Sequence, residues 1–255
     1  METQDLDLEQ DAARDAAEGV EEKIPETGED FGMAEEMIKA GLIYGHKKSK
    51  TNPKFKPYIY TTRNGVEIID VTQTLPALNS AVEFLSGILK NKGSVLIVAT
   101  QPAAKEAATS LAKKFNFSII NDRWIGGLLT NFKVISKRID YFKKNQEDMA
   151  KGEFEKYTKK ERVMINRKIE KMRKMFSGLE DLNKLPDLVF IVDFSIKGHN
   201  TALREAMRLN IPVMAIIDSD DNPDFADYPI PANDHAKISI DWLIKKIEEQ
   251  TVVNG

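Results

Sequence analysis

A run of cationic side chains between residues 46 and 56 is the part of this sequence best suited to bind a polyanion. Five lysines and one histidine share these positions. Pro53 and Pro57 stiffen the run and remove backbone donors. A stiff basic loop can follow a phosphate backbone with little ordering cost, whereas an ordinary solvated loop seldom concentrates lysine to this degree. We therefore predict that this run, the basic loop, binds phosphates.

The pair Arg123-Trp124, within residues 121–132, is a second candidate. The guanidinium is a permanent fork of hydrogen-bond donors, and the neighbouring indole has a flat face. Phosphates and RNA bases are ligands that suit this combination. A packed Trp beside a solvated Arg at a turn explains the two residues equally well. The chemistry of the pair alone leaves both interpretations open.

Residues 121–132, which we call the hub segment, are expected to turn the chain from a strand into a helix. The apolar run 117–120 before them is typical of a buried strand, and a long helical pattern follows them. Gly126 and Gly127 allow backbone conformations that are closed to other residues. Thr130 or Asn131 is expected to cap the helix by accepting a hydrogen bond from a free N–H group.

The hub segment resembles the sequence motif of the family of universal small-subunit ribosomal protein two. In that family an acidic residue, Arg-Trp, a Gly-Gly pair and Leu-Thr-Asn-Phe occur in this order, as they do here. The basic loop is also similar to the family, which has Gly-His, a basic-rich run and Asn-Pro-Lys at this place. The resemblance covers about residues 31–247. The RNA-facing positions that it implies in the basic loop are His46, Lys47, Lys48, Asn52, Lys54 and Lys56.

Arg63 is a further candidate RNA contact. It precedes Asn64-Gly65, which is the strongest short signal for a β-hairpin turn, between two β-prone runs at 58–62 and 66–70. At such a tip a solvated side chain is as good an explanation as a phosphate ligand.

The net charge of −3 hides a segregation of charge along the 255 residues. Residues 1–30 hold 12 acids and 2 bases, which predicts a disordered acidic extension. A solubilising tail is favoured there over an acidic arm that screens the basic surface. Residues 31–132 hold 7 acids and 13 bases, and residues 133–180 hold 8 acids and 15 bases. These two blocks carry +6 and +7, which favours a polyanionic partner.

Composition also limits the class of protein. The chain has no cysteine, which excludes disulfides and thiol chemistry and fits a reducing compartment. No apolar run reaches the roughly 18 residues of a membrane span. The N-terminus is too acidic for an organellar transit peptide and lacks the basic start and apolar core of a secretory signal.

Alternating apolar strands and helical patterns predict an α/β fold with a doubly wound, flavodoxin- or Rossmann-like parallel sheet. Continuous apolar runs of this kind are typical of strands buried on both faces. The expected strands are 95–99, 117–120, 188–192 and 213–217, and the expected helices are 33–40, 75–90, 102–115, 201–209 and 234–250.

More than sixty residues separate the strands 117–120 and 188–192, too many for one crossover. Apolar residues from Phe132 to Phe142 and from Ile165 to Leu179 recur in steps of 3 and 4. Both runs are heptad seams, which predicts an inserted antiparallel coiled-coil hairpin at 132–182. The resemblance implies the same hairpin in bacterial members. Its basic residues nearest the body, the preferred rRNA contacts, are Lys133, Lys137 and Arg138.

An enzyme interpretation lacks its motifs. The turns that follow the expected strands match neither dinucleotide-binding nor P-loop patterns. The three histidines have no spacing typical of a metal site. Acids at 218, 220, 221 and 224 could hold Mg²⁺ after a strand, but capping of turns and solvation of a loop is the favoured explanation. We therefore expect no catalysis, no metal and no cofactor.

Three functions remain: an rRNA-binding ribosomal protein, a nucleotide-binding α/β enzyme, and a coiled-coil adaptor that binds only protein. The basic loop and the resemblance favour the first. The resemblance implies cytoplasmic ribosomes as the location. It also implies partners in small-subunit rRNA and neighbouring proteins, with the large mRNA-binding first protein as a candidate. No membrane or small-molecule substrate is expected. The expected division is an extension at 1–30, an α/β domain at 31–131 and 183–255, and the hairpin at 132–182.

Overall fold

A computed structural model describes residues 29–254 of the chain. The extension predicted at 1–30 therefore lies outside the described residues, apart from its last two positions. These two begin helix α2 (Glu29–Lys39), which is longer than the helix expected at 33–40. Within residues 29–254, no helix combines the length and the apolar character that crossing a bilayer requires.

A five-stranded parallel sheet forms the centre of the molecule. Its strands lie in the order β5-β4-β6-β7-β8, and every neighbouring pair is parallel. The strands are β4 (Val95–Val98), β5 (Ser118–Ile120), β6 (Leu188–Val192), β7 (Val213–Ile217) and β8 (Tyr228–Pro231). The predicted doubly wound α/β fold is thereby confirmed.

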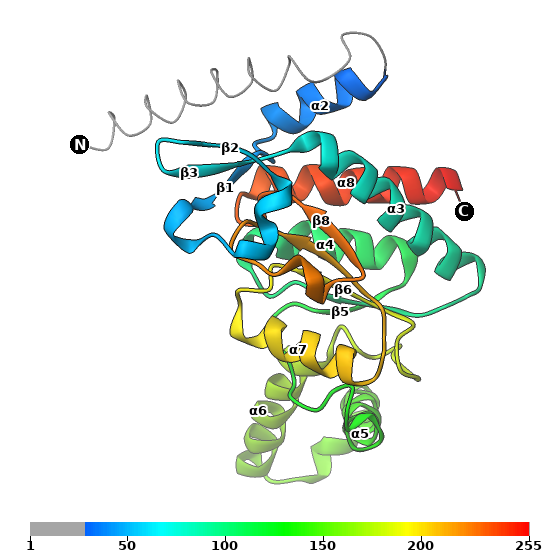
Figure 1. Cartoon of the computed structure of the whole chain (residues 1–255). Coiled ribbons are helices and arrows are strands. Elements are labelled where there is room, and N and C mark those ends of the chain that lie inside the picture. The colour runs from blue at the N-terminus through cyan, green and yellow to red at the C-terminus, as the bar shows by residue number, and fades with distance from the viewer. Residues whose placement is uncertain (1–28, 255) are drawn as a thin grey trace.

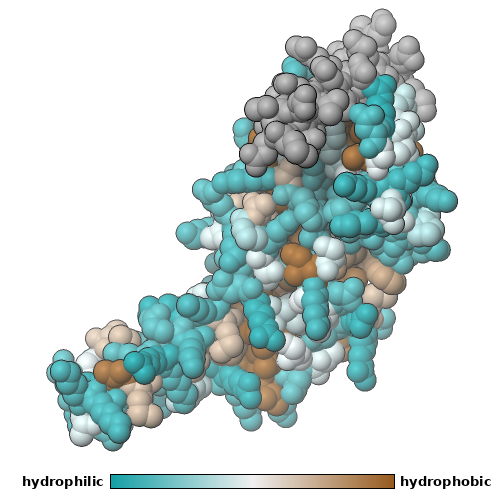
Figure 2. Space-filling view, turned by 90° about the vertical axis from the view of Figure 1, so that its left-hand side faces the viewer, coloured by the Kyte–Doolittle hydropathy of each residue, from teal (hydrophilic) through white to brown (hydrophobic). Residues whose placement is uncertain are grey.

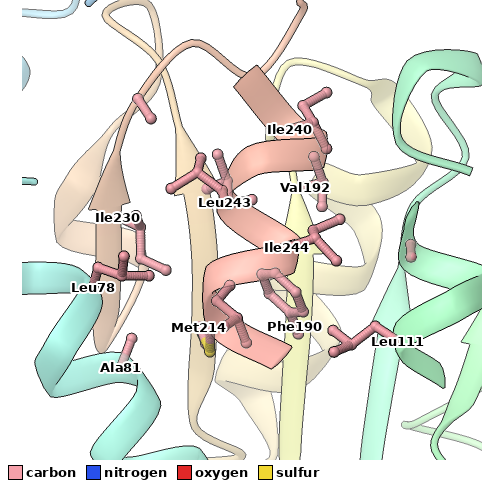
Figure 3. Close-up of a cluster of buried hydrophobic side chains, with 14 of the residues drawn as sticks. Leu78, Ala81, Leu111, Phe190, Val192, Met214, Ile230, Ile240, Leu243 and Ile244 are labelled. Atoms are coloured by element: carbon pink, nitrogen blue, oxygen red, sulfur yellow. The ribbon is translucent and has the colours of Figure 1, made fainter. Parts of the chain in front are cut away.

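Helices α3 (Val71–Lys90), α4 (Pro102–Phe115) and α8 (Lys237–Asn254) cover one face of this sheet (Figure 1). Figure 3 shows this core, in which Phe190 and Met214 of the sheet meet the α8 side chains. Successive residues of a strand point to opposite faces. Neighbouring positions therefore belong to two separate cores.

Helix α7 (Lys197–Arg208), the hub segment and the base of the predicted hairpin form the second core. Val189 and Ile191, which alternate with the residues of the first core, contribute from β6. Phe55 of the basic loop is fully buried in the same core. The two segments predicted to contact RNA are therefore anchored on one face of the sheet.

Strand β8 was not predicted, because Pro229 and Pro231 interrupt its apolar pattern. Proline cannot donate to a ladder, so it is tolerated mainly on edge strands. β8 lies at the edge of the sheet, which explains how it carries two prolines.

The basic loop belongs to a small antiparallel sheet in the order β1-β3-β2. Its strands are β1 (Tyr44–Lys47), β2 (Ile59–Arg63) and β3 (Val66–Ile69). The predicted hairpin is confirmed, since Asn64 and Gly65 take φ values of 50° and 79° between β2 and β3. Two 3₁₀ turns, η1 (Lys48–Lys50) and η2 (Pro53–Tyr58), carry most of the lysines. The basic loop is thus folded backbone rather than an irregular connection.

Two helices project from the body as an arm at the foot of the molecule (Figures 1 and 2). They are α5 (Phe132–Ala150) and α6 (Lys159–Phe176), joined through η3 (Glu153–Lys156). The predicted seam lies between them, with the rings of Phe142 and Phe176 centred 6.1 Å apart. The buried seam residues are Ile135, Ile139, Phe142, Ile169, Met172 and Phe176. Supercoiling of the pair, and the division into domains, stay predictions.

Candidate RNA-binding surface

One buried carboxylate holds the hub segment in place. Glu205 of α7 accepts a hydrogen bond from the indole N–H of Trp124 at 3.0 Å. It also accepts from the backbone N–H groups of Gly127, Leu129 and Thr130 at 2.8, 3.1 and 3.2 Å. The hydroxyl of Thr130 donates to it as well, at 3.2 Å. A loop with this many bonds to one anion is fixed relative to the sheet.

The charge of Glu205 is part of this arrangement. Burial by itself would raise the pKa of Glu205, but the hydrogen bonds from Trp124 and from three backbone N–H groups outweigh burial and lower it. The carboxylate is 7% exposed and ionised, and its donors neutralise it locally. Glu205 was missed by sequence analysis because it lies 81 residues from Trp124 and no local pattern connects the two.

The start of α5 corrects two expectations. Asn131 occupies the N-cap position, but its side chain makes no capping hydrogen bond. The Thr130 hydroxyl donates to Glu205 instead of capping the helix. The buried anion has taken over the task of satisfying free N–H groups near the turn. Of the two glycines, only Gly127 takes a positive φ, of 83°.

The structure separates the two members of the Arg123-Trp124 pair. Trp124 is 5% exposed and packs in the second core, whereas Arg123 is exposed at the surface. Packing and the bond to Glu205 account for Trp124, whose ring faces the interior in this conformation. Contact of either residue with RNA stays a prediction, and we retain only Arg123 in the proposal below.

The basic loop is tied to the connection between β7 and β8. The backbone N–H of Asn52 donates to the carbonyl of Ser219 at 2.8 Å. The side-chain oxygen of Asn52 accepts from the backbone N–H of Lys54 at 3.0 Å and caps η2. Lys54 pairs with Asp224 at 2.8 Å. The exposed lysines of the loop are Lys47, Lys48, Lys50, Lys54 and Lys56.

His46 faces inward rather than toward solvent. Its Nδ1 lies 2.8 Å from Oδ2 of Asp218, and its side chain is 18% exposed. The hydrogen bond to Asp218 raises the pKa of His46, against the opposing effect of burial. An RNA contact by His46 stays a prediction, but its present partner is a buried acid.

Gly45 allows β1 to approach the sheet this closely. A Cβ atom at position 45 would lie 2.8 Å from Ser219 Oγ and 3.1 Å from Asp218 Oδ1. At Gly126 of the hub segment, by contrast, a Cβ would meet nothing within 4 Å. The close approach at Gly45 therefore has a specific steric requirement.

We expect Gly45→Ala to lower the free energy of unfolding by about 1–3 kcal/mol, because the added methyl group would force β1 away from Ser219. Gly126→Ala is the matched control, and we expect a change within about 0.5 kcal/mol. Urea denaturation of the full chain and both variants measures the difference. Equal stabilities of the two variants would contradict the steric role of Gly45.

The remaining candidate cations lie on the arm and on the small sheet. Lys133, Lys137 and Arg138 are exposed in the first turns of α5, next to the hub segment. Arg63 is half-buried at the end of β2, so it does not stand free at the hairpin tip. No item of local structure tests which of these side chains meets RNA, and all four stay predictions.

Parallel strands bring the hub segment and the basic loop to one edge of the sheet. The hub segment follows β5, and the basic loop is bonded to the residues after β7. Carboxyl ends of parallel strands share one edge, which is where open α/β sheets bind ligands. Figure 2 shows that hydrophilic side chains cover most of the side of the molecule turned to the viewer, including the arm. An α/β scaffold with cations on ordered loops and an arm is typical of proteins that hold a folded polyanion.

Comparison with known proteins identifies the family. The family model described as Ribosomal protein S2 matches residues 37–254. The small ribosomal subunit protein uS2 of Pseudoalteromonas translucida is 44% identical over 201 residues, or 79% of this chain and 82% of the relative. The uS2 proteins of Rhizobium etli and Dehalococcoides mccartyi are 43% and 36% identical, over 83% and 85% of this chain and 81% and 88% of the relatives. The chain belongs to the ribosomal protein S2 family.

Proposed function

We propose that this chain is a structural constituent of the small ribosomal subunit and binds its rRNA with the basic loop, Arg123 and the base of the arm. The observation that carries the proposal is the ordered basic loop. Its lysines are exposed, while its backbone is bonded to Ser219 and its Phe55 is buried in the core. Cations on fixed backbone bind phosphates without a further ordering cost.

The mechanism is electrostatic positioning. Lysine and arginine side chains neutralise phosphates and release counterions. Glu205 keeps the hub segment rigid, so that Arg123 and Lys133 hold a constant spacing relative to the sheet. The surface of the protein then selects a folded RNA by shape, and no chemical step takes place.

The position within the subunit and the protein neighbours belong to the same proposal. Membership of the family supports a place on cytoplasmic ribosomes, between head and body and near the point where mRNA leaves. The exposed apolar residues of the arm, among them Met164 at 62% exposure, suit contact with neighbouring proteins, of which the large mRNA-binding first protein is our candidate.

Purified full-length protein is expected to bind small-subunit rRNA with an affinity that falls about 10²- to 10³-fold between 50 and 200 mM salt, as for about four to six phosphate contacts. Filter binding over a salt series measures the slope, and an unrelated RNA of equal length serves as the control. Flat salt dependence would count against phosphate contacts. Protein that sediments free of small subunits in cell extracts would count against ribosomal membership.

A further inference from the structure

Three neighbouring strands bring acidic side chains to one point at the carboxyl edge of the sheet. Asp193 directly follows β6, Asp218 directly follows β7, and Asp234 comes shortly after β8. Because β6, β7 and β8 are adjacent and parallel, these ends meet in space. Sequence spacing gave no sign of the cluster, since its members come from separate connections.

These carboxyl groups are buried together. The exposed fractions of Asp193, Asp218 and Asp234 are 1%, 2% and 0%. Burial raises the pKa of Asp234 well above its usual value, and the charges of Asp193 and Asp218 raise it further. Burial likewise raises the pKa of Asp221 to about 8. An accumulation of buried negative charge is costly unless a cation offsets it.

One oxygen of the cluster lacks a partner. Oδ1 of Asp234 lies 2.6 Å from Nδ1 of His235, but Oδ2 is buried and forms no hydrogen bond among the described residues. Buried polar atoms are nearly always satisfied, so an unpaired carboxylate oxygen calls for a ligand. This observation is independent of the number of acids nearby.

Two histidines complete the cluster from the side of the basic loop. The rings of His46 and His235 are centred 4.7 Å apart in an edge-to-face arrangement. The ligand atoms of His46, Asp218 and His235 all lie within 4.8 Å of one another, and so do those of Asp193, Asp234 and His235. His235 belongs to both triads.

We propose that this cluster binds one divalent transition-metal cation, with His235 as the central ligand and Zn²⁺ as the ion that suits the site best. Imidazole nitrogen together with carboxylate oxygen is a ligand set for Zn²⁺, whereas sites for Mg²⁺ use oxygen alone. The ion offsets the buried negative charge and joins β1, which carries His46, to the end of β7. The metal therefore fixes the root of the basic loop and does not depend on RNA binding.

A network of histidine–carboxylate pairs without metal is the competing explanation. It accounts for the bond between His46 and Asp218, but it leaves Oδ2 of Asp234 unpaired. The two explanations differ in what Zn²⁺ does to the protein. Bound metal must contact His46 and His235, whereas a closed network gives it no site.

Calorimetric titration of the untagged full-length chain with ZnCl₂ tests the proposal. We expect one Zn²⁺ per chain and at least about tenfold weaker binding in His235→Ala. His235 is exposed, so this variant keeps the fold. Asp224→Asn is the matched control, because Asp224 is an exposed acid of the β7–β8 connection outside both triads, and its binding should equal that of the unaltered chain.

Histidine NMR signals give a second measurement with an internal control. We expect Zn²⁺ to shift the ring signals of His46 and His235 but not those of His199. The ring of His199 is buried, with Nδ1 at 2.7 Å from the carbonyl of Asp193 and Nε2 at 2.9 Å from the Thr100 hydroxyl. Absence of saturable Zn²⁺ binding, unchanged affinity in His235→Ala, or equal competition by Mg²⁺ would overturn the proposal.

Discussion

The double variant Lys47→Glu/Lys56→Glu is expected to enter small ribosomal subunits at least about tenfold less than the unaltered chain, a loss of about 1.4 kcal/mol or more in binding free energy. Each substitution replaces attraction to a phosphate by repulsion. The slope of log affinity against log salt should also fall by about one for each lysine lost. Both side chains are exposed, so the free energy of unfolding should change little.

Co-expression of tagged variant and unaltered protein, followed by quantification of both in purified subunits, measures this loss. Lys159→Glu/Lys160→Glu is the matched control, with the same change of charge in the first turn of α6 on the arm. Acids are favourable at a helix N-terminus, so this control is expected to fold. Equal incorporation of the two double variants would remove the assignment of the basic loop as an RNA-binding element.

Glu205→Ala is expected to lower the free energy of unfolding by about 3 kcal/mol or more. It removes the acceptor of five hydrogen bonds, which leaves the indole N–H of Trp124 and three backbone N–H groups without their partner. The hub segment should loosen, and rRNA affinity should fall with it. Glu106→Ala is the control, since the ion pair of Glu106 with Lys237 is on the surface and contributes at most about 1 kcal/mol.

The pH dependence of stability distinguishes the charge of Glu205 from its shape. Its pKa is lowered in the folded state from the usual 4.5, so its stabilising effect is complete above pH 4.5 and is lost as pH falls through the folded value. The difference in unfolding free energy between the unaltered chain and Glu205→Gln should be constant from neutral pH to about pH 5.5 and shrink below about pH 4.5. A difference independent of pH would mean that the hydrogen bonds do not require an ionised group.

Local patterns in the sequence located most elements of the fold. Helix α4 and strands β6 and β7 have the predicted bounds. Proline N-terminal in a helix and continuous apolar runs are signals that act within a few residues, so tertiary contacts seldom override them. Strand β8 failed this test, because only its place at the edge of the sheet makes its two prolines acceptable.

The candidate site was predictable as a list of cations but not as an arrangement. The lysines of the basic loop are exposed, and their contact with RNA stays a prediction. Two residues grouped with them, His46 and Trp124, turn inward to Asp218 and Glu205. Residue type indicates which ligand a side chain suits, whereas the fold decides which partner reaches it first.

The sequence by itself determined the fold class, the family resemblance and the basic character of residues 31–180, because periodicity, motif and charge are properties of neighbouring positions. The tertiary structure decided which distant groups meet. Glu205 lies 81 residues from Trp124, and His46 lies 172 residues from Asp218. Contacts across such separations depend on the order of strands in the sheet, which brings carboxyl ends together without leaving a local trace in the chain.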